Sequence, residues 1–182
     1  MGARQNDRDA REGSASRGSR ARLVCSSLAN FLRLAGSRRL HLSAERLGSS
    51  FRLFDGQLYR VFRETRSALP VQEHTVFEVG FRLRLVGSAW APHWLFQRVC
   101  ILTTPFWSGF AGFGTKLWMV EERTRSYAGI YEWGGSEAAT AYIAVLMPIL
   151  RFVSVTGSVA YRLHEDIALS EFLASRGAGD SF

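Results

Sequence analysis

The 182-residue sequence contains little cysteine and little proline, and each shortage excludes a class of protein. Two cysteines, Cys25 and Cys100, are too few to hold a small secreted scaffold together by disulfides. The low cysteine content predicts a cytoplasmic protein. No cysteine or histidine cluster has the spacing of a zinc site, so we expect no bound metal. Four prolines and a hydrophobic content of 47% are typical of a globular chain rather than a disordered or fibrous one.

Long uninterrupted apolar runs are also missing. The longest strongly apolar stretch, residues 141–153, contains Pro148 and Arg151. It is shorter than the roughly 20 residues that cross a bilayer. The sequence therefore predicts no transmembrane segment.

Positive charge is concentrated at one end of the chain. Residues 1–46 carry ten arginines and four acidic residues, a net +6, whereas residues 47–182 carry a net +1. A nearly neutral body argues against specific nucleic-acid binding, which needs clustered basic side chains. We expect residues 1–46 to be an Arg-rich, largely disordered leader. A separate hypothesis is that translation naturally starts after the first 22 or so residues.

The rest of the chain alternates between strand and helix patterns. Residues 47–72 predict an accessory hairpin that turns at Asp55-Gly56, followed by a linker, and residues 167–182 predict a C-terminal tail. In between, residues 73–166 predict strand, helix, strand, strand, helix and strand, at about 75–86, 88–104, 113–120, 127–133, from Ser136 onward, and 157–163. Pro148 is expected to kink or end the second helix. This order predicts an α+β fold, the ferredoxin-like split βαβ sandwich (βαββαβ).

Side-chain alternation within the strands then divides the sheet into two faces. We expect both helices to cover the more apolar phase, formed by Phe77, Val79, Phe81, Leu83, Leu117, Met119, Ala128 and Ile130. The other phase contains Glu78, Gly80, Arg82, Lys116, Trp118, Gly129, Tyr131 and Trp133. Charges and large rings on one face suit neither solvent nor a plain core. We interpret this face as a pocket floored by the glycines and closed by a second subunit.

Residues 75–164 resemble a known protein family. The motif Gly112-Phe-Gly-Thr-Lys116-Leu-Trp118, then Gly129-Ile-Tyr131-Glu-Trp133, then Ala141-Tyr142 is similar to the YdhR-type mono-oxygenase family of the dimeric α/β-barrel superfamily. The resemblance implies a ferredoxin-like protomer and a homodimer with facing sheets. It also implies a relation to cofactor-independent oxygenases that act on aromatic, polyketide-like molecules.

Candidate roles follow from that chemistry, which needs a base, a dry aromatic pocket and a positive group. Lys116 and Arg82 are candidates for the positive charge, and Glu78 and His93 for the base. Trp118, Tyr131 and Trp133 are candidate substrate-binding rings, with Gly80 and Gly129 as the floor. Each role has a structural alternative: an ordinary Lys116–Glu78 ion pair, a surface position for His93, and a dimer interface for the two tryptophans.

Two functions from different classes remain open. The first is an oxidoreductase, a cofactor-independent mono-oxygenase of a hydrophobic aromatic or quinol-like molecule. The second is a non-catalytic dimeric protein that binds such a molecule in the same pocket. A third hypothesis uses the Arg-rich leader to tether the protein to a membrane or to RNA.

Overall fold

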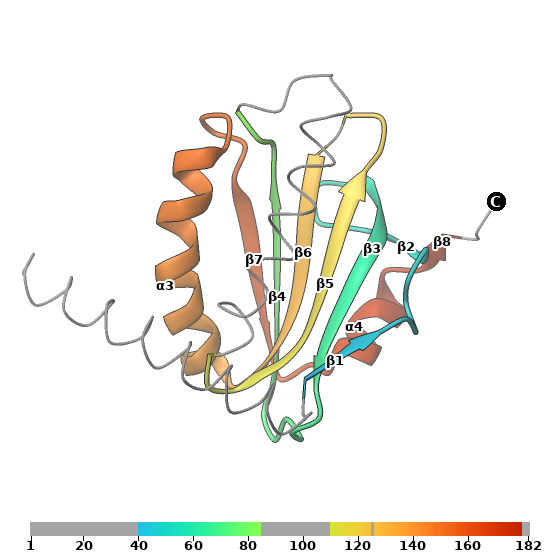
Figure 1. The fold of residues 1–182 in the computed structure, drawn as a ribbon, viewed down its shortest axis with the longest axis vertical. Coiled ribbons are helices and arrows are strands. Elements are labelled where there is room, and N and C mark those ends of the chain that lie inside the picture. Colours follow the sequence, from blue (N-terminus) through green and yellow to red (C-terminus); the bar gives the residue numbers. More distant parts are fainter. Residues whose placement is uncertain (1–39, 85–109, 125, 180–182) are drawn as a thin grey trace, which may run out of the picture.

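The computed structural model describes residues 40–84, 110–124 and 126–179. Within these residues, eight strands form one antiparallel sheet in the order β7-β4-β6-β5-β3-β2-β8, with β1 also paired to β3 (Figure 1). The expected leader through residue 39, the expected helix 88–104 and His93 lie outside the described residues.

The centre of the sheet has the expected ferredoxin-like arrangement. It comprises β4 (His74–Phe81), β5 (Phe113–Glu121), β6 (Ser126–Gly134), α3 (Ser136–Val153) and β7 (Ala160–Glu165). In the order β7-β4-β6-β5, the third strand of the unit, β6, lies between the first and the second, β4 and β5. The predicted α+β, ferredoxin-like fold is therefore confirmed.

Helix α3 begins where the sequence predicted and continues past its proline. Gly135 is the N-cap, with a φ of 97° that favours glycine, and its N–H donates to the carbonyl oxygen of Glu73 at 2.8 Å. Pro148 does not end the helix, which runs on to Val153. Proline has no N–H to donate to the carbonyl of Ala144, four residues earlier. Because Ala144 and Pro148 are both exposed, water can reach that carbonyl.

By length and composition, α3 is also apolar enough to cross a membrane, the one such helix among the described residues. Its place in the fold accounts for that composition. Seven of its side chains are buried, and all seven pack with the sheet core: Ala139, Tyr142, Ile143, Val145, Leu146, Met147 and Leu150. Packing against the sheet is the role that the structure shows for α3.

The predicted hairpin forms and belongs to the same sheet. Strands β2 (Ser50–Arg52) and β3 (Leu58–Ser67) are antiparallel, and Gly56 has the positive φ, 77°, that the turn requires. Strand β3 pairs with β5 along most of its length. β1 (Leu40–Ser43) lies along the other edge of β3.

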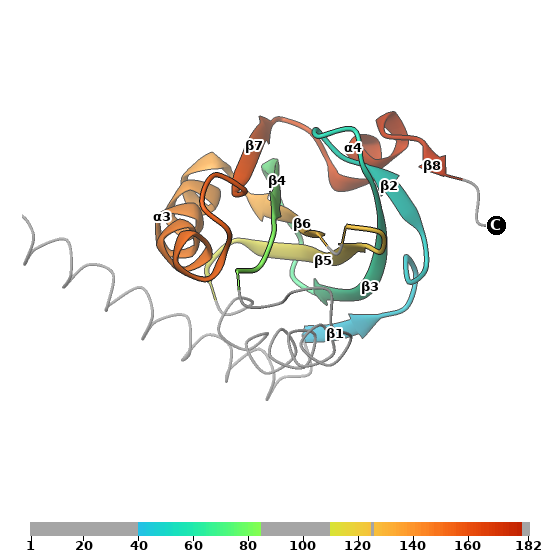
Figure 2. The ribbon, with the colours of Figure 1, turned by 90° about the horizontal axis from the view of Figure 1, so that it is seen from above.

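The segment after β7 forms a second helix, which sequence patterns did not indicate. α4 (Leu169–Ser175) buries Leu169, Phe172 and Leu173, and β8 (Ala178–Gly179) pairs with β2. Seen from above, the sheet curves from β5 through β3 toward β2, and α4 lies on the opposite side from α3 (Figure 2). The chain therefore covers both faces of its own sheet.

Each face of the sheet has its own hydrophobic core. The α3 face carries Phe77, Val79, Phe81, Trp118, Val120, Tyr127, Tyr131 and Trp133, packed with α3. The α4 face carries Tyr59, Val61, Val76, Leu117, Met119, Ala128 and Ile130, packed with α4 and with Phe51 and Leu53. A register shift between Val61 and Arg63 in β3 places Val61 and Glu64 on the same face, since Glu64 pairs with Leu117.

This partition corrects the predicted assignment of faces. Phe77 pairs directly with Tyr131, and Val79 with Gly129, so these residues share the α3 face. The prediction had joined Phe77 and Val79 to Leu117, Met119, Ala128 and Ile130, which lie on the α4 face. It was wrong because it matched the apolar phases of different strands without their register, which pairs Phe77 with Tyr131 and Tyr131 with Lys116. The second face, expected to meet another subunit, is covered by α4 of the same chain.

Candidate functional site

The predicted site residues Lys116, Trp118 and Tyr131 meet on the α3 face. Lys116 and Trp118 alternate along β5, so both side chains point to the same side. The ammonium nitrogen of Lys116 lies 3.1 Å from the centroid of the Trp118 ring and 4.5 Å from that of Tyr131. Lys116 is only 2% exposed, so its charge is removed from water and faces two aromatic rings.

Further aromatic rings of the α3 face pack against Tyr131 and against one another. Tyr131 lies 5.2 Å from Phe77 and 5.1 Å from Tyr142 of α3, measured between ring centroids. Trp133 lies 4.6 Å from Tyr142. Within the described residues, the indole nitrogens of Trp118 and Trp133 are buried and have no hydrogen-bond partner. We call Lys116, Trp118, Tyr131, Phe77 and Tyr142 the Lys116 cluster.

Gly129 has a role here that differs from the predicted one. A Cβ atom at this position would come within 2.7 Å of the Tyr131 ring. The missing side chain therefore lets Tyr131 lie close over β6, next to Lys116. Gly129 makes room for a ring of the same chain rather than forming an open floor.

Glu78 lies on the opposite face and forms a second cluster. Its carboxylate is fully buried, with Oε1 2.9 Å from His164 Nε2 and accepting a hydrogen bond from Arg176 at 2.8 Å. His164 and Arg176 both lie against Phe172 of α4, at 4.9 and 4.8 Å. Oε2 is buried and has no hydrogen-bond partner within the described residues. These four residues are the Glu78 cluster.

The sheet thus separates residues that were predicted to act together. Lys116 pairs with Tyr131 and Tyr131 with Phe77, so Lys116 points to the α3 face and Glu78 away from it. The single pocket and the alternative Lys116–Glu78 ion pair are both wrong for this reason. Trp118, Gly129, Tyr131 and Trp133 stay with Lys116.

Two other predicted residues lie away from the lysine. Gly80 is on the α4 face, where a Cβ atom would lie 3.6 Å from the Phe54 ring and 3.8 Å from the Tyr59 hydroxyl. Arg82 is exposed just beyond the end of β4. Both line a cavity of about 160 Å³ together with Phe54, Tyr59 and Ser158. His93 lies outside the described residues.

Sequence reasoning missed two residues of the Glu78 cluster, His164 and Arg176, the second of which lies in the segment predicted to be a C-terminal tail. A signal was present in the strand order. In a ferredoxin-like sheet the last strand lies beside the first. Arg162 pairs with Glu78 and His164 with Val76, so His164 and Glu78 point to the same face of the sheet. Register, which sequence does not supply, was needed to place His164 next to Glu78.

Metal binding has no support in the described part of the chain. No group of three or more histidine, cysteine, aspartate or glutamate side chains there is arranged to hold an ion. The Glu78 cluster contains one carboxylate and one imidazole, and the cation beside them is Arg176. This arrangement satisfies a buried negative charge.

Comparison with known proteins gives only distant likenesses. No family model matches the chain, and no curated protein matches it. Among solved structures, a major regulator of staphylococcal pathogenesis is 13% identical, with a TM-score of 0.46, over 63% of this chain and 71% of that one. SnoaB, a cofactor-independent oxygenase from Streptomyces nogalater, is 19% identical, with a TM-score of 0.40, over 51% of this chain and 92% of that one.

A third solved structure is described as an uncharacterized ferredoxin-fold protein related to antibiotic biosynthesis monooxygenases, from Listeria monocytogenes. It is 12% identical, with a TM-score of 0.43, over 76% of this chain and 89% of that one. Several of the structural neighbours are therefore described as monooxygenase-like proteins, at low identity. None of these three descriptions concerns the YdhR-type assignment, which stays a prediction.

Proposed function

We propose that the protein binds a small aromatic or quinol-like molecule beside the Lys116 cluster and acts on it as a cofactor-independent mono-oxygenase. The observation that carries the proposal is the buried ammonium of Lys116, held against the rings of Trp118 and Tyr131. A positive charge surrounded by rings is suited to an aromatic ligand that becomes an anion. The resemblance to YdhR-type proteins supplies the reaction class.

The chemistry assigns Lys116 a defined task. A base removes a proton from an acidic C–H group of the substrate, and the ammonium stabilises the carbanion that results. The carbanion transfers an electron to O2, the two radicals combine into a peroxide, and loss of water leaves a carbonyl. In balance, one CH2 group and one O2 become one C=O and one water. His93 keeps its predicted role as the base, whereas Glu78 lies on the wrong face of the sheet.

The non-catalytic alternative uses the same cluster. It is favoured by the position of Glu78, a predicted base, which lies on the opposite face of the sheet from Lys116. A protein that only binds its ligand needs the lysine and the rings but no base. The two functions therefore differ in what loss of Lys116 would change.

The test measures binding and oxygen uptake with the same probe, a hydroxylated anthrone. Binding is followed by tryptophan fluorescence and turnover by O2 consumption and absorbance of the carbonyl product. If the protein is an oxygenase, Lys116→Met lowers turnover by about 100-fold or more and affinity by less. If it only binds, Lys116→Met lowers affinity and the wild type consumes no O2.

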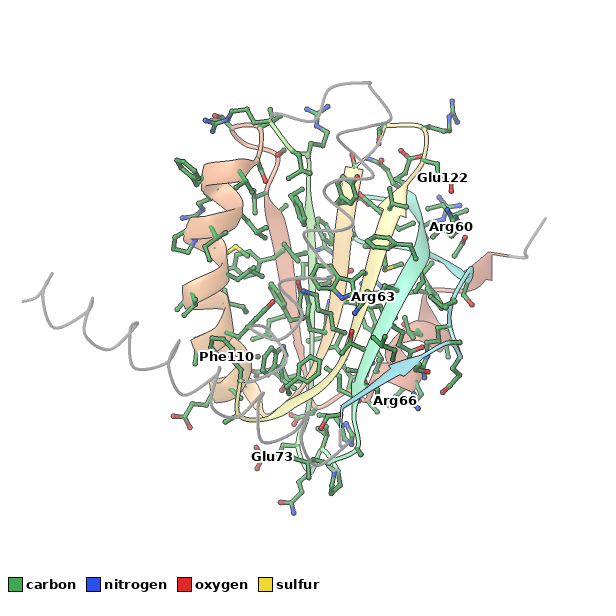
Figure 3. All side chains as sticks on the ribbon, viewed as in Figure 1. Arg60, Arg63, Arg66, Glu73, Phe110 and Glu122 are labelled. Carbon is green, nitrogen blue, oxygen red and sulfur yellow. The ribbon has the colours of Figure 1, made fainter. Side chains whose placement is uncertain are left out.

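The matched control removes a different cation. Arg60 on β3 is exposed, and its Nε donates to Glu122 Oε1 at 2.7 Å in an ion pair at the surface (Figure 3). Arg60→Met should leave binding and turnover unchanged. Wild-type protein that neither binds the anthrone nor consumes O2, or equal effects of the two substitutions, would contradict the proposal.

The homodimer implied by the resemblance is kept as part of this proposal, with one change. The sheet face away from the predicted helices was expected to meet a second subunit, and in this chain the face away from α3 is packed against α4 and the residues of β2. A homodimer of this protein therefore has to form through another surface.

A further inference from the structure

The ends of β4 and α3 are fastened together at one end of the sheet (Figure 1). Leu83 forms an isolated bridge with Ser154. The N–H of Arg84 donates to the Val153 carbonyl at 2.9 Å, and that of Val155 donates to the Arg82 carbonyl at 2.8 Å. Because Leu83 is buried, its neighbours Arg82 and Arg84 point outward, and both are exposed.

Large apolar side chains are exposed beside these arginines. Phe152, in the last turn of α3, is 80% exposed, Ile149 is 42% exposed and Val155 is 36% exposed. Scattered exposed apolar residues are normal, but these three lie within seven positions at one end of one helix. Together with Arg82, Arg84 and Arg151 they form what we call the apical patch.

The charge of the apical patch has one sign. Its three arginines are all exposed, and no carboxylate of the described residues forms a salt bridge with any of them. The segments that build the patch, 82–84 and 149–158, contain no acidic residue. The Nε of Arg84 donates to the carbonyl oxygen of Ser154 at 3.2 Å, which fixes its side chain at the patch.

We propose that the apical patch docks on the surface of an anionic lipid bilayer. Phe152 and Ile149 would enter the boundary between headgroups and acyl chains, and the three arginines would bind lipid phosphates. Guanidinium groups suit phosphates because they offer several donors in one plane. A nucleic acid would also attract the arginines, and its bases stack on aromatic rings, but it offers no apolar layer for the aliphatic side chains of Ile149 and Val155.

The Arg-rich N-terminal residues add a second attraction to the anionic bilayer. Residues 1–39 carry nine arginines and three acidic residues, a net +6, and each basic side chain near an anionic bilayer adds to the binding. One weak anchor gives reversible binding, whereas two signals together give stable attachment. The patch supplies the apolar contact that an Arg-rich segment lacks.

The experiment uses full-length protein and vesicles. Co-sedimentation is compared between vesicles that contain phosphatidylglycerol and vesicles of phosphatidylcholine alone, and we expect binding to the anionic vesicles only. Phe152→Ser should weaken this binding by about tenfold, from the apolar area it no longer buries. Arg82→Gln combined with Arg84→Gln should weaken it by about tenfold or more.

The control replaces an exposed apolar residue elsewhere. Leu42 on β1 is 68% exposed, and Leu42→Ser should leave vesicle binding unchanged. Three results would overturn the proposal: no binding to anionic vesicles, binding that Phe152→Ser leaves intact because the arginines of residues 1–46 carry it alone, or binding to short RNA without binding to vesicles. Circular dichroism of each variant confirms that a lost signal does not come from unfolding.

Discussion

The two faces of the sheet hold their buried charges in different ways. On the α4 face the buried groups are carboxylates, and arginines from flanking segments reach them: Arg46 donates to Glu64 at 2.7 Å and Arg176 to Glu78 at 2.8 Å. On the α3 face the buried group is the cation Lys116, held against rings. One face therefore uses charge to attach chain segments to the sheet, and the other presents a positive charge among aromatic side chains. The first arrangement serves the fold, and the second suits ligand chemistry.

The largest test of this contrast removes a cation that reaches a buried carboxylate. Arg176→Met leaves the fully buried Glu78 with His164 alone, and we expect the free energy of unfolding to fall by about 3 kcal/mol. Arg60→Met removes an arginine from an exposed pair with Glu122 and should cost less than about 1 kcal/mol. Urea unfolding of both variants gives the comparison. Equal losses would mean that Glu78 does not depend on Arg176.

A second test adds the same methyl group to each face. In Gly129→Ala the new Cβ would lie 2.7 Å from the Tyr131 ring, so the ring must move, and we expect a loss of about 2 kcal/mol from overpacking. In Gly80→Ala the Cβ would lie 3.6 Å from the Phe54 ring, an ordinary contact. That variant should be as stable as the wild type or slightly more so, because alanine loses less backbone freedom on folding. Thermal unfolding distinguishes the two, and equal stability of both variants would contradict close packing at Gly129.

The smallest expected effect concerns Glu121, a carboxylate on the α4 face that is held mainly by a turn. Burial raises the pKa of Glu121, but hydrogen bonds from the Thr124 hydroxyl and from the N–H groups of Thr124 and Arg123, together with the charge of Arg123, outweigh burial and lower that pKa below its usual range. The stabilisation is therefore present at neutral pH and lost as pH falls through the lowered pKa. Glu121→Gln should cost about 1 kcal/mol at pH 7.

The same variant can be followed in acid. The difference in unfolding free energy between wild type and Glu121→Gln should shrink below about pH 4, because the carboxyl of the unfolded chain takes up its proton there while that of the folded protein is still ionised. Urea titrations at several pH values measure it. A difference that stays constant down to low pH would mean that the turn does not hold the ionised form.

Local patterns were sufficient for the central elements of the fold. The Asp55-Gly56 turn, the β5–β6 hairpin and the start of α3 after Gly134-Gly135 each depend on neighbours in sequence, and all three were predicted. The order of the central strands followed from the order of elements. These features need no knowledge of long-range packing.

The faces could not be predicted in the same way. Alternation fixes which side chains share a side within one strand, but the phase between strands depends on register. With aromatic rings on one face and aliphatic side chains on the other, both phases of β5 and β6 are apolar enough to be buried. Lys116 was correctly grouped with Trp118 and Tyr131, and wrongly with Glu78, because only the first grouping is set within β5 and its partner β6.

The arginine contacts on the α4 face also bear on where the chain can be shortened. Arg46 precedes β2 and Arg176 follows α4, so the two residues that neutralise Glu64 and Glu78 both come from outside 73–166. A fragment trimmed to the ferredoxin-like unit alone would keep the buried Glu78 without Arg176 and bare the aliphatic side of its sheet to water. Adding β3 to cover that side brings in the buried Glu64, which in turn needs Arg46. The smallest stretch that can be expected to survive on its own therefore has to extend to Arg46 on one side and Arg176 on the other.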